Sequence, residues 1–293
     1  MEKFDKGGTL SESIEFEWDF DAFQFQLESC KYDDAVQVSL NYMTDKNLKI
    51  LEAGSGSGRV VKYFSDLGYK NVYGIELNKE IVHTLNRKYP ELKVIQGSIL
   101  KMPYEKNRFD IVVSYGLVEH FPKGLKGPLL SLFNVLKPGG TAIITVPSFN
   151  HLRQFKLYID KYFRFLCLRK NNFIRKLLRK KLLPTKRNVV GYRGYMYYVY
   201  PQFGDFLEYR LKPREFEDIC KSTGFELLES IPISHIDGLY HEATHNFRKY
   251  LLKFDATYCF EISKPARYLN ELLKKKKFFH NHMHACVLKK PLT

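Results

Sequence analysis

Short apolar runs alternate with amphipathic segments between residues 48 and 147. The apolar runs are rich in Val, Ile and Leu and end at turn residues, so each predicts a buried β-strand: Lys49–Ala53, Asn71–Glu76, Lys93–Gln96, Phe109–Ser114 and Thr141–Val146. Apolar positions at helical spacing lie between them and predict helices at about Arg59–Leu67, Lys79–Tyr89 and Leu125–Leu136. Strands that alternate with such helices predict a parallel α/β sheet covered on both faces.

The same pattern divides the rest of the chain into three further parts. Residues 1–47 carry an acidic, aromatic stretch and a helical pattern at about Tyr32–Met43, ahead of the core at 48–150. Residues 151–212 differ from the core in their basic and aromatic composition and predict a cap insertion. Residues 213–293 return to the core pattern, with a predicted helical insertion at 236–278. Their core elements are a helix at Pro213–Thr223 and strands at Phe225–Ile231 and His282–Leu288.

A glycine-rich turn follows the first predicted strand. It reads Glu52-Ala53-Gly54-Ser55-Gly56-Ser57-Gly58, and a helix begins directly after it. Glycine adopts positive φ angles and lets a ligand approach the backbone, and the helix start offers free N–H groups. The dinucleotide fingerprint requires a third glycine at position 59, which is Arg59 here. The turn therefore predicts a nucleotide site of another kind at the carboxyl end of the first strand.

The G-x-G-x-G turn, with Glu52 ahead of it, resembles motif I of the class I S-adenosylmethionine-dependent methyltransferases. Glu76 ends the second strand 22 positions after Gly54, and Leu136-Lys137-Pro138-Gly139-Gly140 precedes the fifth strand as in that family. The resemblance covers about 100 residues and includes quinone-biosynthesis and other small-molecule methyltransferases. It implies a Rossmann-like sheet of seven strands with an antiparallel last strand, helical cap insertions and S-adenosylmethionine as cofactor.

The resemblance also implies roles for individual residues. The amino-acid part of the cofactor would lie against Glu52 and the glycine turn, its ribose at Glu76 and Leu77, and its adenine at Ser98 and Ile99, where Ser98 replaces the acid usual in the family. Ser114 and Tyr115 would lie near the methyl group. The cofactor-binding set is Glu52, Gly54, Ser55, Gly56, Ser57, Gly58, Glu76, Leu77, Ser98, Ile99, Ser114 and Tyr115.

His120 follows the fourth strand and is the candidate catalytic residue. Imidazole titrates near neutral pH and could remove a proton from an acceptor hydroxyl. Alternatively, His120 only shapes the cofactor pocket. The chain lacks the Asn/Asp-Pro-Pro-aromatic turn of enzymes that methylate nucleic-acid bases at an amino group. We therefore predict methyl transfer to a small molecule, lipid or sugar, at oxygen, with an RNA methyltransferase or a non-catalytic membrane scaffold as alternatives.

The net charge is +15, which favours an anionic partner. Residues 152–183 contain eleven Lys or Arg and one acid, interleaved with apolar residues, and Pro184 would end the segment. Such a basic amphipathic segment could lie on an anionic membrane, bind RNA phosphates or form a solvated lid. Of these partners, nucleic acid is the less favoured. The five scattered cysteines and the lack of a signal-like N-terminus predict a cytoplasmic protein, peripheral at the membrane if the segment binds lipid.

Several histidines form patterns that could bind a metal or a substrate. His241-Glu242-Ala243-Thr244-His245 matches the zincin signature H-E-x-x-H, but no third ligand follows, so we favour His241 and His245 as substrate-pocket residues. Tyr192 and Tyr195, in an aromatic cluster of the first insertion, are further pocket candidates. Alternate residues of the last strand share one face and are interpreted as packed side chains rather than metal ligands: His280, His282, His284 and Cys286.

Overall fold

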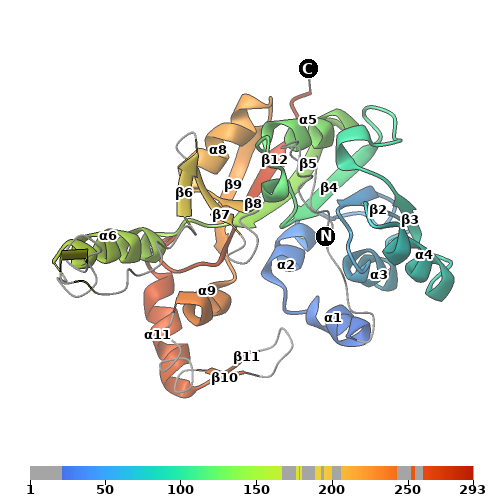
Figure 1. Cartoon of the computed structure of the whole chain (residues 1–293). Helices are drawn as coiled ribbons and strands as arrows, with labels where there is room; N and C mark the ends of the chain where they lie inside the picture. Colours follow the sequence, from blue (N-terminus) through green and yellow to red (C-terminus); the bar gives the residue numbers. More distant parts are fainter. Residues whose placement is uncertain are drawn as a thin grey trace.

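The computed structural model describes residues 22–166, 176–177, 179, 189–192, 195–199, 206–242, 252–254 and 260–292. Its centre is a seven-stranded sheet in the order β3-β2-β1-β4-β5-β12-β9 (Figure 1). The strands are β1 Lys49–Ala53, β2 Asn71–Glu76, β3 Lys93–Gln96, β4 Phe109–Tyr115, β5 Leu136–Pro147, β9 Glu226–Ile233 and β12 Met283–Lys289.

The strand directions match the predicted fold class. The pairs β1–β2, β1–β4, β2–β3 and β4–β5 are parallel, whereas β12 is antiparallel to both β5 and β9. The carboxyl ends of every strand except β12 therefore meet at one edge of the sheet. The prediction of a Rossmann-like sheet with an antiparallel last strand is confirmed.

Alternate residues of each strand fill two hydrophobic cores, one on each face of the sheet. Leu51 of β1 belongs to one core and its neighbour Ile50 to the other. Helices α3 Arg59–Asp66 and α4 Lys79–Lys88 cover the Ile50 face, and α5 Lys126–Val135 and α8 Pro213–Ser222 cover the Leu51 face. Burial on both faces explains why the core strands read as continuous apolar runs rather than alternating ones.

Two short helices precede the sheet, α1 Phe23–Ser29 and α2 Asp34–Leu40, where the sequence predicted one helix at Tyr32–Met43. The side chain of Asp33 accepts a hydrogen bond from the Ala35 N–H and so begins α2 two residues later than predicted. Residues 1–21 lie outside the described part. The described residues contain no helix with the length and apolarity required to cross a membrane.

Two insertions leave the carboxyl edge of the sheet. The first follows β5 and contains α6 His151–Leu166 and an antiparallel sheet of β6 Val189–Tyr192, β7 Tyr195–Val199 and β8 Phe206–Arg210. The second follows β9 and contains α9 His235–Glu242, the strand pair β10 Leu252–Phe254 and β11 Phe260–Ile262, and α11 Lys264–Lys274.

The prediction that these insertions are helical is therefore wrong in part. The strands β6 and β7 contain Val and Tyr at most positions, and such residues favour an extended backbone. Much of the basic segment that follows α6, including Pro184, lies outside the described residues.

Candidate cofactor and acceptor site

The glycine turn between β1 and α3 has the backbone that its sequence predicts. Gly54, Gly56 and Gly58 have φ angles of 76°, 50° and 78°, in the left-handed region that favours glycine. A Cβ atom on Gly54 would lie 2.6 Å from Leu117 Cδ2. The N–H groups of Gly54 and Ser55 both donate to the carbonyl oxygen of Ile75, at 2.9 and 3.1 Å. These bonds fix the turn against the end of β2.

Glu76 is the carboxylate that faces this turn. Its Oε2 accepts a hydrogen bond from the Gly56 N–H at 2.8 Å, and its Oε1 accepts one from the Asn78 N–H at 3.1 Å. An ionised carboxylate has about four acceptor positions. Two positions thus remain for hydroxyl groups of a ligand, and the two backbone bonds hold both oxygens in place.

Glu52 also borders the site, but it is buried beneath the turn. Its Oε2 accepts a hydrogen bond from the Val61 N–H at 3.2 Å, in the first turn of α3. Burial raises the pKa of Glu52 to about 8, although the Arg59 cation and the Val61 N–H oppose the shift. The Glu52 carboxyl therefore supports the start of α3 from within the core.

Most of the predicted cofactor residues line one pocket at the carboxyl edge of the sheet. These residues are Glu52, Gly54, Ser55, Gly56, Ser57, Glu76, Leu77, Ser98, Ile99 and Tyr115, and the candidate base His120 lines the same pocket. Gly58 and Ser114 do not line it. Gly58 is the N-cap residue directly before α3, and the Ser114 side chain is fully buried within β4.

Six further residues line this pocket and were not predicted: Arg59, Ile75, Gly97, Gly116, Leu117 and Phe121. Most of them are neighbours of predicted residues on the same loops, so the loop positions alone could have indicated them. Arg59 differs, because the sequence analysis used it only to exclude a dinucleotide. Its place at the first residue of α3 points its side chain toward the pocket.

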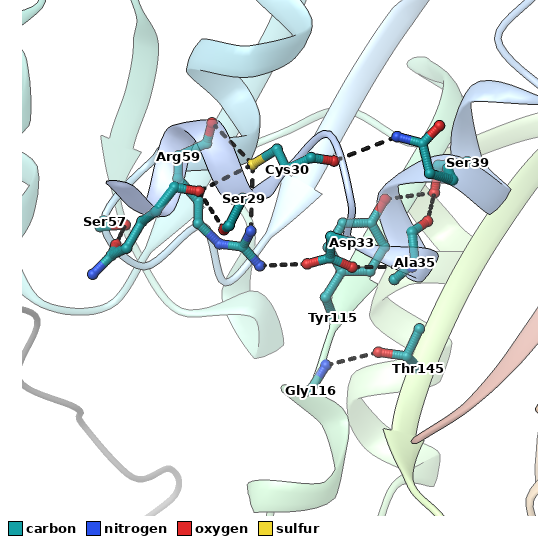
Figure 2. Close-up of polar contacts among 12 residues, drawn as sticks. Ser29, Cys30, Asp33, Ala35, Ser39, Ser57, Arg59, Tyr115, Gly116 and Thr145 are labelled. Carbon is teal, nitrogen blue, oxygen red and sulfur yellow. Dashed lines mark hydrogen bonds and ion pairs between the residues drawn. The ribbon is translucent and has the colours of Figure 1, made fainter. Parts of the chain in front are cut away.

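Helices α1 and α2 are fastened to the glycine turn by polar contacts (Figure 2). The Arg59 guanidinium forms an ion pair with Asp33 at 2.7 Å, and its second nitrogen donates to Cys30 Sγ at 3.3 Å. The Ser57 hydroxyl donates to Gln26 Oε1 at 2.8 Å, and Ser39 of α2 contacts the Tyr115 hydroxyl. The two helices thus contact three residues that line the pocket, Ser57, Arg59 and Tyr115.

His120 lies at the end of the 3₁₀ helix Val118–His120, beside an acid that the sequence analysis did not single out. Its Nε2 is 3.8 Å from Oε1 of Glu119, a carboxyl that is only 1% exposed. Oε2 of Glu119 has no hydrogen-bond partner among the described residues. Burial raises the pKa of the Glu119 carboxyl well above its usual range.

His241 lies in α9 and stacks on His282, with ring centroids 4.3 Å apart. Glu242 is occupied by cations: Arg153 Nε donates to its Oε1 at 2.5 Å and Lys156 Nζ donates to its Oε2 at 2.7 Å. The H-E-x-x-H pattern therefore does not place a free carboxylate beside His241. His245 lies outside the described residues. Tyr192 and Tyr195 pair with each other across β6 and β7, and only their backbone is described.

The alternating histidines near β12 contact neighbours, as the packed interpretation predicts. His280 Nε2 is 2.9 Å from Asn270 Oδ1, His282 Nδ1 is 2.8 Å from Arg153 Nη2, and His284 Nε2 is 2.9 Å from Ser230 Oγ. Burial lowers the pKa of His280 to about 4, so its ring is neutral. The described residues contain no group of three side chains that could hold a metal ion.

Known proteins resemble the chain in this region. The family model for a methyltransferase domain matches residues 51–144. A demethylmenaquinone methyltransferase of Chlorobaculum tepidum is 24% identical over 190 residues, which cover 65% of this chain and 70% of that protein. A ubiquinone/menaquinone biosynthesis C-methyltransferase of Wigglesworthia glossinidia brevipalpis is 33% identical over 139 residues, 43% of this chain and 53% of that protein.

Solved structures extend the likeness to the fold. The structure of an S-adenosylmethionine-dependent methyltransferase from Methanosarcina mazei superposes with a TM-score of 0.51 at 15% sequence identity, covering 87% of this chain and 98% of that one. The family match spans the glycine turn, Glu76 and β4, which are the elements that build the pocket. The chain therefore contains a methyltransferase domain at residues 51–144 and has the fold of the class I S-adenosylmethionine-dependent methyltransferases.

Proposed function

We propose that the chain transfers a methyl group from S-adenosylmethionine to an oxygen of a small-molecule or lipid acceptor, with His120 as the general base. The observation that carries this proposal is that Glu76 and His120 line a single pocket, one near the glycine turn and the other after β4. A cofactor held at Glu76 would extend along the carboxyl edge of the sheet toward His120.

The pocket residues fit this cofactor. Glu76 offers two free acceptor positions for the ribose hydroxyls, and its oxygens are already oriented by Gly56 and Asn78. Ser98 Oγ accepts a hydrogen bond from the Leu100 N–H at 3.3 Å, which leaves one lone pair and its own hydrogen for the adenine. Ser55 Oγ is buried without a partner among the described residues and lies beside the turn. Gly54 and Gly56 admit the amino-acid part close to the backbone.

The cofactor, when bound, supplies a methyl group on a sulfonium that a nucleophile displaces in line. The protein orients the two reactants and excludes water. His120 would take the proton of the acceptor hydroxyl on a ring nitrogen, and α1 and α2 would keep solvent from the cofactor side of the pocket. Glu119 is buried beside His120, with its Oε1 3.8 Å from the imidazole Nε2.

Carbon is the second candidate for the accepting atom. The two relatives are named as enzymes that methylate quinone precursors or act in quinone biosynthesis, and one is called a C-methyltransferase. A phenolic ring could accept a methyl group on either its oxygen or its carbon once the hydroxyl has lost its proton. His120 would serve as the base in both cases.

The test uses S-adenosylmethionine labelled with ¹³C in its methyl group. The enzyme is incubated with a lipid extract and with a water-soluble extract, and the products are separated and analysed by NMR. An O–CH₃ signal supports the proposal, and a C–CH₃ signal replaces it by the second candidate. The variant His120→Asn should lose activity at neutral pH and recover part of it at higher pH, where the acceptor ionises by itself. Full activity of His120→Asn at neutral pH would remove His120 from the mechanism.

The basic segment of residues 152–187 belongs to the proposal as a contact with an anionic membrane. In its described part, Phe155 and Tyr158 of α6 are exposed, which supports the proposal. Arg153 is buried and paired with Glu242, so this cation contributes to the fold and not to a surface. Preferential binding to RNA would instead support an RNA methyltransferase.

A further inference from the structure

The helix α11, in the second insertion, has two opposite faces. Ala266 and Asn270 are buried and hold the helix on the protein body, and Asn270 Oδ1 contacts His280 Nε2 at 2.9 Å. Tyr268 and Leu272 lie on the other side of the helix, because they follow the buried pair by two positions each, or about 200° of helical rotation. Their side chains are 74% and 49% exposed. The pair is one turn apart and forms a single apolar ridge.

Cations lie beside this ridge and in the run that ends the helix. Residues 264–277 contain six Lys or Arg and one acid, Glu271, and each of the six cations is exposed: Lys264, Arg267, Lys274, Lys275, Lys276 and Lys277. Lys264 and Lys275 lie on the ridge side of the helix by their spacing from Tyr268 and Leu272. A single exposed Leu or Tyr is ordinary on a protein surface. An aromatic and an aliphatic side chain with a cation at each end of the same face is the pattern of a helix that lies in a membrane interface.

The position of α11 fits this pattern. The helix belongs to the insertion after β9, and the chain that follows it contacts the start of α6: the His151 N–H donates to the Phe278 oxygen at 3.0 Å, and the Leu152 N–H donates to the Phe279 oxygen at 2.9 Å. α6, α9 and α11 gather on one side of the molecule, beyond the carboxyl edge of β5 and β9 and away from α3 and α4 (Figure 1). A surface that docks on α11 would face the side from which an acceptor reaches the sheet edge.

We propose that the exposed face of α11, together with the lysine run 274–277, is a docking surface for an anionic lipid bilayer. Tyr268 and Leu272 enter the boundary between headgroups and acyl chains, and the six cations lie at the level of the phosphates. Charge complementarity alone would also suit RNA, but the apolar ridge between cations matches a bilayer. This α11 surface does not include the segment 152–187, and the proposal does not depend on the identity of the methyl acceptor.

The experiment measures co-sedimentation of the full chain with phosphatidylcholine vesicles, with and without phosphatidylglycerol, over a salt series. Wild-type protein should bind only the anionic vesicles, and part of the binding should persist at moderate salt because apolar burial contributes to it. Neutralising four cations, in the variant Lys264→Gln/Arg267→Gln/Lys274→Gln/Lys275→Gln, should weaken binding at least about tenfold, since each cation near such a surface contributes about 1 kcal/mol. Tyr268→Ser/Leu272→Ser should remove the salt-resistant part.

Two matched variants control for general effects. Lys79→Gln/Arg87→Gln/Lys101→Gln/Lys106→Gln removes four exposed cations, two in α4 and two in the chain between β3 and β4, with the same change in net charge. Tyr32→Ser/Leu228→Ser removes an exposed tyrosine and leucine away from α11. Both should bind vesicles as the wild type does.

Equal losses in the α11 and α4 charge variants would overturn the proposal, as would wild-type protein that binds neutral and anionic vesicles equally or neither. Retention by an RNA filter-binding assay without vesicle binding would overturn it in favour of RNA. Binding of S-adenosylmethionine, measured on the same samples, is expected to be unchanged in every variant. Loss of vesicle binding by a variant can therefore be distinguished from damage to its methyltransferase site.

Discussion

The contribution of Glu76 to cofactor binding can be worked out from its hydrogen bonds. The Gly56 and Asn78 N–H groups use two acceptor positions of its carboxylate, which leaves two for the ribose hydroxyls. Hydrogen bonds to a charged group contribute about 1.5–3 kcal/mol. We therefore expect Glu76→Ala to raise the Kd for S-adenosylmethionine by at least the loss of one such bond, about 10- to 150-fold.

Isothermal titration calorimetry with S-adenosylmethionine and its demethylated product measures this change. Glu80→Ala is the matched control, because Glu80 is an exposed acid four residues later in the first turn of α4. Since Glu76 also accepts from Gly56, a loosened turn could contribute to the loss. Glu76→Gln separates the two effects, because it keeps one acceptor oxygen and should bind more tightly than Glu76→Ala. An unchanged Kd for folded Glu76→Ala would refute the assignment of the ribose to Glu76.

Three further expectations concern stability. Gly54→Ala should abolish cofactor binding and destabilise the fold by more than about 1–2 kcal/mol, because it adds a clash with Leu117 to the strain of a positive φ. Gly68→Ala, at φ 88° with open space around it, should show only the strain. Equal urea midpoints for the two variants would count against the clash. Burial raises the pKa of Glu52 to about 8 in the folded protein, so the folded state binds this proton more tightly than the unfolded state does. The free energy of unfolding should therefore fall as pH rises from about 4.5 toward 8. Glu52→Gln should flatten this pH dependence in urea unfolding, and an unaltered slope would show that the pKa of Glu52 is not raised by folding. Lys290 Nζ donates at 2.8 Å to Asn107 Oδ1 and to the carbonyl oxygens of Phe133 and Leu136 at the end of α5. Lys290→Met should therefore lower the free energy of unfolding by about 1–2 kcal/mol, while Lys289→Met should have little effect. Thermal melts that do not distinguish the two variants would refute this helix cap.

The core of the fold could be predicted because its local signals agree with its tertiary structure. Strands buried on both faces read as apolar runs, and β1, β2 and β3 begin and end at the predicted residues. The glycine turn and Glu76 could be placed for the same reason, since the parallel arrangement brings the ends of β1 and β2 to one edge. The antiparallel direction of β12 came from the family resemblance and not from its sequence pattern.

The insertions and the surroundings of His120 could be predicted less well. Cationic and aromatic residues at near-helical spacing predicted helices throughout 151–183. That spacing does not show that the chain continues into antiparallel strands, which begin at the strand-favouring residues Val189 and Val190. Glu119 was overlooked because a carboxyl beside a histidine is usually exposed, and its 3₁₀ helix becomes buried only where it packs against β8 and β5. Arg59 was overlooked because its partner Asp33 is 26 positions away in the sequence.

The ion pair between Arg153 and Glu242 has a consequence for how this enzyme can diverge. Arg153 belongs to the insertion after β5 and Glu242 to the insertion after β9, and both side chains are almost fully buried. Loss of Glu242 would leave the Arg153 cation in the interior without this carboxylate, which is costly, and loss of Arg153 would leave Glu242 paired with Lys156 alone. Descendants that reshape one insertion to accept a new molecule must therefore alter the other in step. We expect the two caps to be inherited and exchanged together, as one unit, while the sheet beneath them stays the same.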